Sequence, residues 1–251
     1  MTASNVIASE KLRKTPGATP RRRKTAKFDR KLVEILHTAA AVFAEVGYDP
    51  ASIRMVADRA GVSVAGLYYY VHSKEELLYL IQYHVFDGLV RRFEDDSARM
   101  LAGGGEEDRP EMRLQRFILN HLDHFLADMA SLTVCTRELG RLSGDYLYRV
   151  EALQRAYFSQ AFEIFRELGA NRSDGPVDPR AATLAMFGAV NWVSTWYDPD
   201  SDKSAAELAG EFVKLFLTGV TGAGAQSAKR PTGAAGRALG TASTRKDRGR
   251  R

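Results

Sequence analysis

Cysteine is almost absent from this chain of 251 residues, and long apolar runs are missing. The single cysteine, Cys135, excludes an intramolecular disulfide framework and any zinc or iron–sulfur site built from several thiolates. No apolar run approaches the roughly 18 residues that a membrane span needs, and the charged N-terminus lacks the apolar segment of a secretory signal. We therefore expect a soluble cytoplasmic protein that has no membrane partner.

Sustained two-residue alternation of apolar and polar side chains is also missing, so we expect no β-sheet. Apolar residues recur instead at three- and four-residue steps, which predicts an all-α fold of about nine helices. Ser73 with Glu76 and Ser204 with Glu207 have capping-box spacing, and Asp178 before Pro179 is typical of a helix start. The predicted helices begin near Leu32, Ser52, Ser63 and Ser73 and continue over residues 109–128, 131–140, 144–169, 178–197 and 203–220.

Positive charge is concentrated at the two ends of the chain. Residues 1–30 carry nine Lys or Arg against two acidic residues, and residues 222–251 carry eight against one, whereas the remainder is net acidic. Residues 1–27 and 222–251 also lack apolar periodicity, so we expect both to be disordered. Such basic tails either contact phosphate groups or only improve solubility.

The segment from Ser52 to Leu77 combines two short helices with a glycine turn, and reads SIRMVADRAGVSVAGLYYYVHSKEEL. Small side chains at the start of its second helix allow the backbone to approach a surface closely, as a helix in the DNA major groove must. Tyrosine hydroxyls and helix N-termini are good partners for phosphate. Leu67, Val62 and Tyr70 are expected to pack inside this unit.

The run from Phe43 to Leu77 resembles the DNA-binding domain of the tetracycline-repressor (TetR) family. The matching elements include Ala60-Gly61-Val62-Ser63, Leu67-Tyr68-Tyr69-Tyr70 and Ser73-Lys74-Glu75-Glu76-Leu77, whereas Ala65-Gly66, Val71 and His72 depart from the common pattern. The resemblance implies that DNA is contacted by Ser52, Arg54, Ser63, Val64, Ala65, Gly66, Tyr68, Tyr69 and Lys74. A basic arm would add phosphate or minor-groove contacts through Arg21, Arg22, Arg23, Lys24 and Lys27.

The resemblance also implies a domain order: a helix-turn-helix domain over 28–74 and an effector-binding and dimerisation domain over 75–221. The last two predicted helices carry apolar faces that would pack against their copies as a four-helix bundle. The alternative is that both helices are core within one subunit. The residues expected at the dimer interface are Phe187, Trp196, Phe212, Leu215 and Phe216.

Aromatic residues are frequent on the middle helices. Most are expected to be core, but an apolar cavity among them would suit a small ligand. Residues 184–199 are similar to the C-terminal region of TetR-type repressors of fatty-acid and steroid degradation, which respond to acyl-CoA, and Arg137 and Arg141 could then meet the CoA phosphates. The candidate pocket residues are Phe93, Phe117, His121, Phe125, Arg137, Arg141, Tyr157, Phe158, Asn191 and Trp192.

Together these features predict a non-enzymatic, homodimeric repressor that leaves a palindromic operator when an effector binds. The long helix from Ser73 would be the lever. No cofactor is expected, and the glycine run 103–105 lacks the Gly-Lys-Ser/Thr of a phosphate loop. Two alternatives remain open: an architectural DNA binder without an effector, and a metal-dependent sensor or enzyme that uses His121 and His124.

Overall fold

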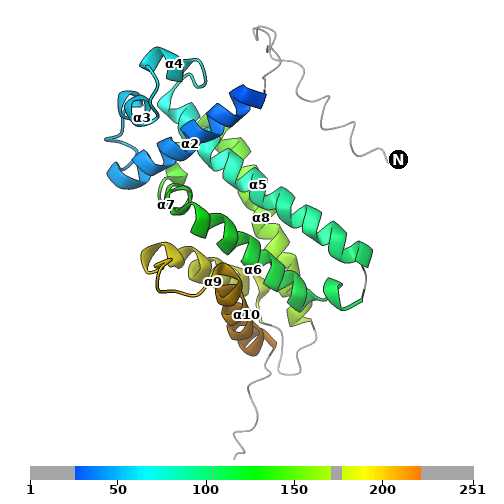
Figure 1. Cartoon of the computed structure of the whole chain (residues 1–251). Coiled ribbons are helices and arrows are strands. Elements are labelled where there is room, and N and C mark those ends of the chain that lie inside the picture. Colours follow the sequence, from blue (N-terminus) through cyan, green and yellow to red (C-terminus); the bar gives the residue numbers. More distant parts are fainter. Residues whose placement is uncertain (1–25, 104, 171–176, 222–251) are drawn as a thin grey trace, which may run out of the picture.

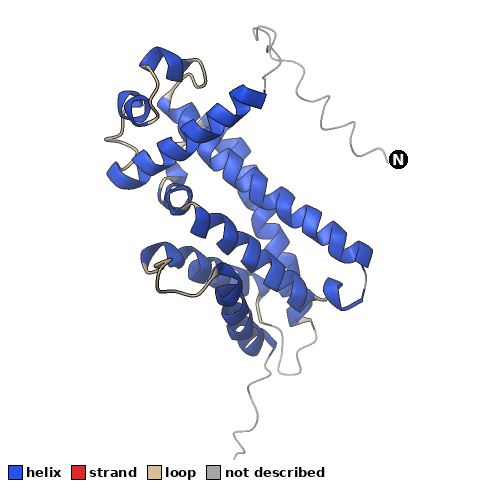
Figure 2. Cartoon of the chain, in the orientation of Figure 1, coloured by secondary structure: helices blue, strands red, loops and turns tan. Residues whose placement is uncertain are grey.

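The structure, a computed structural model, describes residues 26–103, 105–170 and 177–221. Within these ranges it contains nine α-helices and three short 3₁₀ turns and no strand (Figure 2). The all-α prediction is confirmed. The α-helices are α2 (Ala26–Val46), α3 (Ile53–Arg59), α4 (Val64–Tyr68), α5 (Lys74–Gly103), α6 (Pro110–Ala127), α7 (Met129–Arg137), α8 (Gly144–Gly169), α9 (Pro179–Asn191) and α10 (Ala205–Thr221).

Helices α2, α3 and α4 gather at the start of the long helix α5, whereas α6, α7 and α8 pack along the rest of it, and α9 and α10 pack on α6 and α8 beyond them (Figure 1). The starts of several helices agree with the predicted caps. Asp178 accepts a hydrogen bond from the backbone N–H of Arg180 at 2.9 Å. Ser204 and Glu207 bond reciprocally, with the Ser204 N–H donating to the Glu207 carboxylate at 3.0 Å. Each such cap satisfies backbone donors that the first helical turn leaves unpaired.

The described residues form two apolar clusters, one around α2 to α4 and one among α6, α8, α9 and α10. The first cluster also includes Val134 of α7 and Leu142 and Val150 further along the chain, so the N-terminal helices share their core with the C-terminal part. Helix α5 begins at the predicted domain boundary, with Lys74 as its first residue. Residues of α7 and α8 are therefore part of the packing of the N-terminal unit.

Three helices have bounds that differ from the prediction. Helix α2 starts at Ala26 rather than near Leu32, so Ala26 and Lys27, which were expected in a disordered tail, are helical. Helix α7 starts at Met129 because Asp128 caps it, accepting from the N–H of Ser131 at 3.1 Å. Helix α9 ends at Asn191, and residues Trp192–Thr195 form a 3₁₀ turn, η4. There the hydroxyls of Ser194 and Thr195 donate to backbone carbonyls three residues earlier. Such local bonds compete with continued α-helix and tighten the last turn.

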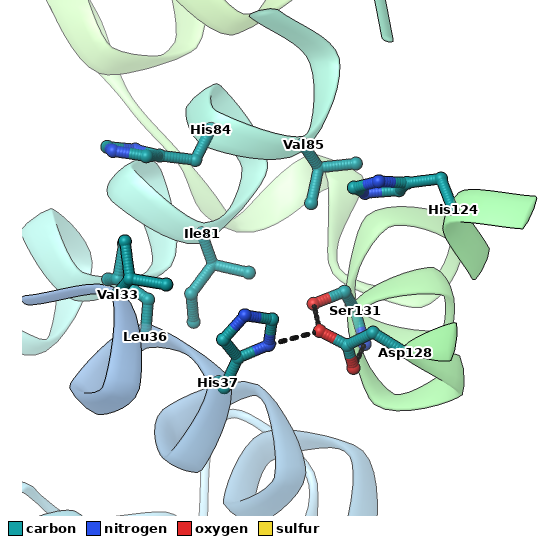
Figure 3. A pocket seen from close by; sticks show the side chains of 9 residues that line it. All are labelled: Val33, Leu36, His37, Ile81, His84, Val85, His124, Asp128 and Ser131. Carbon is teal, nitrogen blue, oxygen red and sulfur yellow. Dashed lines mark hydrogen bonds and ion pairs between the residues drawn. The ribbon is translucent and has the colours of Figure 1, made fainter. Parts of the chain in front are cut away.

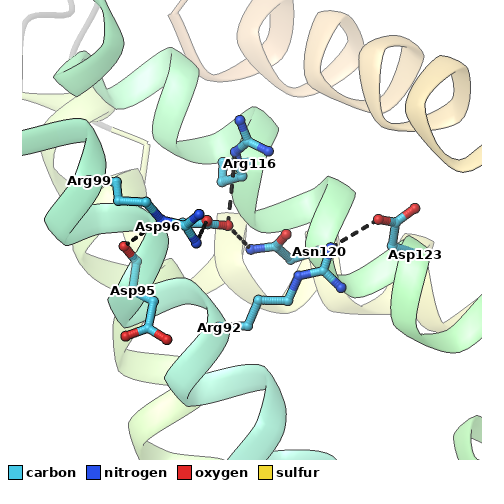
Figure 4. Close-up of polar contacts among 7 residues, drawn as sticks. All are labelled: Arg92, Asp95, Asp96, Arg99, Arg116, Asn120 and Asp123. Atoms are coloured by element: carbon cyan, nitrogen blue, oxygen red, sulfur yellow. Dashed lines mark hydrogen bonds and ion pairs between the residues drawn. The ribbon is translucent and has the colours of Figure 1, made fainter. Parts of the chain in front are cut away.

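A line of polar contacts joins α5 to α6 (Figure 4). Arg92 donates to Asp123 at 3.0 Å, and Asn120 donates to Asp96 at 2.7 Å. Arg99 also donates to Asp96, at 2.6 Å. The first two contacts join α5 to α6 at two levels, whereas Arg99 and Asp96 both lie on α5. Among the described residues, no helix combines the length and the apolar character that a membrane crossing requires.

Candidate nucleic-acid interface and ligand cavity

Helices α3 and α4 form a helix-turn-helix whose geometry follows from a few small residues. Ser52 caps α3 by accepting from the N–H of Met55, and Ser63 caps α4 by accepting from the N–H of Gly66 at 3.0 Å. Gly61 lies between the helices with φ of +64°, which favours glycine. A Cβ at residue 66 would lie 3.1 Å from the Ser63 hydroxyl, so glycine leaves room for this cap.

The outward face of α4 carries small side chains followed by two exposed tyrosines. Leu67 is fully buried, whereas Tyr68 is 46% exposed and Tyr69 is 67% exposed. The other predicted contact residues on these helices lie at the surface or partly buried: Ser52, Arg54, Ser63, Val64, Ala65 and Gly66. Since the second helix of such a unit is the one that enters the major groove, the structure leaves α4 accessible for that purpose.

Lys74, which the sequence placed among the DNA contacts, forms hydrogen bonds within the protein. Its ammonium donates to the carbonyls of Tyr48, Asp49 and Ala51 at 2.9, 3.1 and 3.0 Å. It also lies over the Tyr48 ring, 4.4 Å from the centroid. An ammonium has only three donors, so in this conformation Lys74 holds the α2–α3 turn together and has none left for a phosphate.

The start of α2 lies beside the reading helix. Phe28 contacts the rings of Tyr69 and Tyr70, with centroids 5.6 and 4.8 Å away. Lys27 is exposed one residue earlier. The other predicted arm residues lie outside the described residues: Arg21, Arg22, Arg23 and Lys24. Helix α2 therefore begins next to α4, so an arm attached there could contact the DNA that α4 contacts.

A cavity of about 290 Å³ lies among the helices of the C-terminal part. Five helices contribute to its wall, and none of the lining side chains is acidic, lysine or arginine. The lining residues are Phe86, His121, Phe125, Leu132, Cys135, Thr136, Gln154, Tyr157, Phe158, Phe187 and Asn191. An apolar wall with a few neutral polar groups is typical of a small-molecule site.

The polar groups in the cavity wall are held neutral. Burial, with a smaller contribution from His124, lowers the pKa of His121 to about 3, while Asn191 opposes this shift. Burial raises the pKa of the Tyr157 phenol and of the Cys135 thiol well above their usual ranges. Removing a charged group from water without a partner is costly, so these side chains remain uncharged at neutral pH. The cavity therefore presents hydrogen-bonding groups but no charge.

The structure brings five of the predicted pocket residues together in this wall: His121, Phe125, Tyr157, Phe158 and Asn191. The others lie elsewhere. Phe117 stacks against the ring of Tyr157, and Phe93 packs in turn against the ring of Phe117. Trp192 is 66% exposed.

The two arginines of the predicted pocket are both exposed. Arg141 pairs with Asp49 at 2.8 Å and with Glu138 at 3.5 Å, so it faces the α2–α3 turn. Arg137 lies at the end of α7. The sequence resemblance suggested Arg137 and Arg141 as pocket residues, but it does not determine which way their side chains point.

Several lining residues were not predicted: Phe86, Leu132, Cys135, Thr136 and Gln154. Phe187 also lines the cavity, although the sequence placed it at the dimer interface. It contacts the rings of Tyr157 and Phe158. On each helix the lining residues have the same spacing as ordinary core residues. No pattern within one helix therefore distinguishes a cavity wall from close packing.

Helix α7 connects this cavity to the N-terminal unit. Leu132, Cys135 and Thr136 line the cavity from its middle. At its start, the Asp128 cap lies 2.6 Å from Nδ1 of His37 on α2. At its end, Glu138 accepts from the N–H of Tyr48 at 3.4 Å. One short helix thus forms part of the cavity wall, and the residues at its two ends contact α2 and the α2–α3 turn.

A second cavity, of about 100 Å³, lies where α2, α5 and the α6–α7 junction meet (Figure 3). His37, His84, His124 and Asp128 contribute to its wall. His124 therefore faces this small cavity, whereas His121 lines the larger one. No group of three or more metal-type ligands occurs among the residues that the structure describes, so the metal alternative gains no support.

Apolar side chains on α9, η4 and α10 remain exposed in the single chain. Trp196 and Leu215, both predicted at the dimer interface, are 43% and 63% exposed. Leu184 and Trp192 are exposed on the same elements. Phe212 and Phe216 are half-buried and pack against the core. Large apolar side chains that are exposed on contacting elements are suited to an interaction surface.

The fold and the accessible α4 define the class of protein: a helix-turn-helix DNA-binding regulator with a ligand-binding domain. Residues 35–79 match the family described as bacterial regulatory proteins, tetR family, and residues 107–220 match the tetracyclin repressor-like C-terminal domain. The solved structure of the TetR-family regulator PfmR from Thermus thermophilus is 30% identical with a TM-score of 0.62, over 73% of this chain and 96% of that one. The chain belongs to the TetR family of transcriptional regulators.

Two further relatives share the arrangement. The repressor KstR2 of Mycobacterium tuberculosis is 27% identical over 195 residues, which are 75% of this chain and 92% of that protein. AibR, solved in complex with isovaleryl coenzyme A and operator DNA, is 23% identical with a TM-score of 0.57, over 74% of this chain and 97% of that one. At that identity AibR shows a shared fold.

Proposed function

We propose that this chain is a homodimeric repressor that leaves its operator when a small acyl compound enters the 290 Å³ cavity. The observation that carries the proposal is α7, whose middle lines the cavity while its two ends contact α2 and the α2–α3 turn. As a regulator the protein acts by binding and not by catalysis, and it acts in the cytoplasm, where its DNA is.

The DNA contacts are assigned to the exposed residues of α3 and α4. Ala65 and Gly66 allow close approach to the major groove, and Tyr69 donates its hydroxyl to a phosphate. Arg54, Ser52, Ser63, Val64 and Tyr68 lie on the same unit. Lys74 is not included, because its three donors are used within the protein.

Dimerisation is assigned to the exposed apolar residues of α9, η4 and α10. Trp196 and Leu215 are the two predicted interface residues that the single chain leaves accessible. Burying them against a second copy removes apolar surface from water. Two-fold symmetry then presents two α4 helices to two half-sites, which matches a palindromic operator.

An acyl-CoA is the effector that we propose. AibR was solved with isovaleryl coenzyme A, and the cavity suits the acyl part. Because a cavity of 150 Å³ takes benzene, 290 Å³ holds about a dozen non-hydrogen atoms. The CoA moiety would remain outside, where Arg180 lies 6.0 Å from the ring of the lining residue Phe158. Arg141 is a weaker candidate, because it already pairs with two carboxylates.

Release follows as a shift between two arrangements of the dimer. A ligand that displaces the wall formed by Leu132, Cys135 and Thr136 moves α7. Through Asp128 and Glu138 this movement reaches α2 and the α2–α3 turn. The reading helices then no longer match successive major grooves. In this account α7 transmits the signal, in addition to the long helix α5 that the sequence suggested.

In vitro selection from a random duplex pool tests the function directly. We expect the purified protein to enrich a palindrome, to bind it as a dimer, and to release it on addition of an acyl-CoA from a chain-length series. Failure to enrich any duplex at low ionic strength would contradict DNA recognition. Enrichment of a palindrome that no acyl-CoA releases would support DNA recognition and would refute acyl-CoA as the effector class.

A further inference from the structure

Tyr157 and His121 form a buried pair in the cavity wall whose hydrogens can be assigned. The Tyr157 hydroxyl lies 3.1 Å from Nδ1 of His121, and both residues are almost fully buried. The phenol carries one hydrogen, and Nδ1 is the acceptor that lies within its reach. If Nδ1 carried a hydrogen instead, the buried phenolic hydrogen would have no acceptor, which is unfavourable.

This assignment places the ring hydrogen of His121 on Nε2. Nε2 is sealed from solvent and has no hydrogen-bond partner of good geometry among the described residues. The side chain of Asn191, which also lines the cavity, lies close enough to favour a hydrogen on the ring. The Nε2–H group is therefore a buried donor that is poorly satisfied by the protein alone.

We infer that His121 is the recognition point for a neutral carbonyl oxygen of the effector, and that the cavity rejects the corresponding free carboxylate. This inference rests on the proposed function only in that the effector occupies this cavity. A carbonyl that moves the Asn191 side chain aside gains a fixed N–H donor, and the donor gains a full partner.

The absence of charged groups from the cavity wall is the reason to expect that the cavity rejects a carboxylate. No acidic, lysine or arginine side chain lines the cavity, and burial keeps His121 neutral. A carboxylate would lose its hydration with no positive charge to replace it. An ester, thioester or ketone presents the same carbonyl oxygen without that loss. The cavity thus separates an activated acyl group from its free acid.

Probes that share a ten-carbon chain test the selectivity: methyl decanoate, decane and decanoate. Cys135 is the single cysteine and lines the cavity, so the NMR shift of its ¹³C-labelled Cβ reports occupancy without requiring the thiol to ionise. We expect methyl decanoate to bind about tenfold more tightly than decane, and about a hundredfold more tightly than decanoate. Equal binding of the ester and decane, equal binding of the ester and decanoate, or binding of none of the probes, overturns the inference.

Variants locate the effect at His121. His121→Phe should abolish the preference for the ester over decane, whereas His121→Gln, which retains a donor, should restore most of it. Gln154→Met, which changes another neutral polar residue of the wall, should leave the preference unchanged. A preference that survives in His121→Phe would refute the role of His121.

A ligand-free readout is available from the ¹⁵N chemical shifts of the His121 ring. We expect the neutral ring with hydrogen on Nε2 from pH 5.5 to pH 8, and loss of this tautomer preference in Tyr157→Phe. A protonated ring, or hydrogen on Nδ1, overturns the assignment. Operator release by an acyl-CoA that is equal in the wild type and His121→Phe would leave the proposed function standing and refute only this inference.

Discussion

Helices α4 and α7 are both short, and they differ in where their functional residues face. Helix α4 presents small residues and tyrosines to solvent and is held by one buried leucine, Leu67. Helix α7 is mostly buried and is tied at both ends to other parts of the chain. A surface made from consecutive residues can be read from the sequence, whereas a connecting element is defined by its partners in space.

The largest expected effect separates structural from DNA-binding roles beside α4. Lys74→Met should lower the free energy of unfolding by about 2 kcal/mol, because three carbonyls lose a charged donor. For a chain of this size the midpoint of thermal unfolding should fall by about 4–8 °C. Lys31→Met, which removes a surface pair with Glu34, is the control and should change little. A Lys74→Met protein that is as stable as the wild type but has lost operator affinity would show that Lys74 contacts DNA.

The second prediction concerns the tie between α7 and α2. Asp128→Asn keeps a residue that caps helices well but removes the charge facing His37. We expect operator affinity without effector to change little, and the loss of affinity caused by decanoyl-CoA to shrink about tenfold. Binding titrations with and without decanoyl-CoA measure both quantities.

Asp123→Asn is the matched control for that variant. It makes the same change on α6, but Asp123 pairs with Arg92 of α5 (Figure 4). Its response to decanoyl-CoA should equal that of the wild type. An Asp128→Asn protein that responds as strongly as this control would show that the signal does not pass through the start of α7.

The smallest expected effect lies on α4 itself. Tyr69→Phe should weaken operator binding about fivefold, which corresponds to one lost hydrogen bond to phosphate. Dimerisation, measured by analytical ultracentrifugation, should be unaffected. Tyr148→Phe changes an equally exposed tyrosine on α8 and serves as the control. Unchanged operator affinity in Tyr69→Phe would remove its phosphate contact.

The helices themselves were predictable, because apolar periodicity and caps such as Asp178 act within a few residues. The end of α9 was not, since hydroxyl-to-carbonyl bonds of Ser194 and Thr195 tighten that turn. The cavity was predicted only in part. His121 and Tyr157 were recognised as polar or aromatic residues on middle helices, but Cys135 and Thr136 looked like ordinary core.

Directions of long side chains were the least predictable feature. Lys74 and Arg141 are cations in positions where a phosphate contact was expected, and both point to partners in the α2–α3 turn. The Phe187 side chain lines the cavity, whereas the Trp192 side chain is exposed. Each depends on neighbours more than 20 residues away in the sequence, which periodicity along one helix does not encode.

The central claim is that filling the cavity and leaving the operator are one event. The most direct test titrates the operator-bound dimer with decanoyl-CoA and follows the NMR shift of the ¹³C-labelled Cys135 Cβ and operator release in the same samples. We predict that both curves share one midpoint. Operator release that precedes the change in the Cys135 shift, or a complete change in that shift while the operator stays bound, would contradict the account.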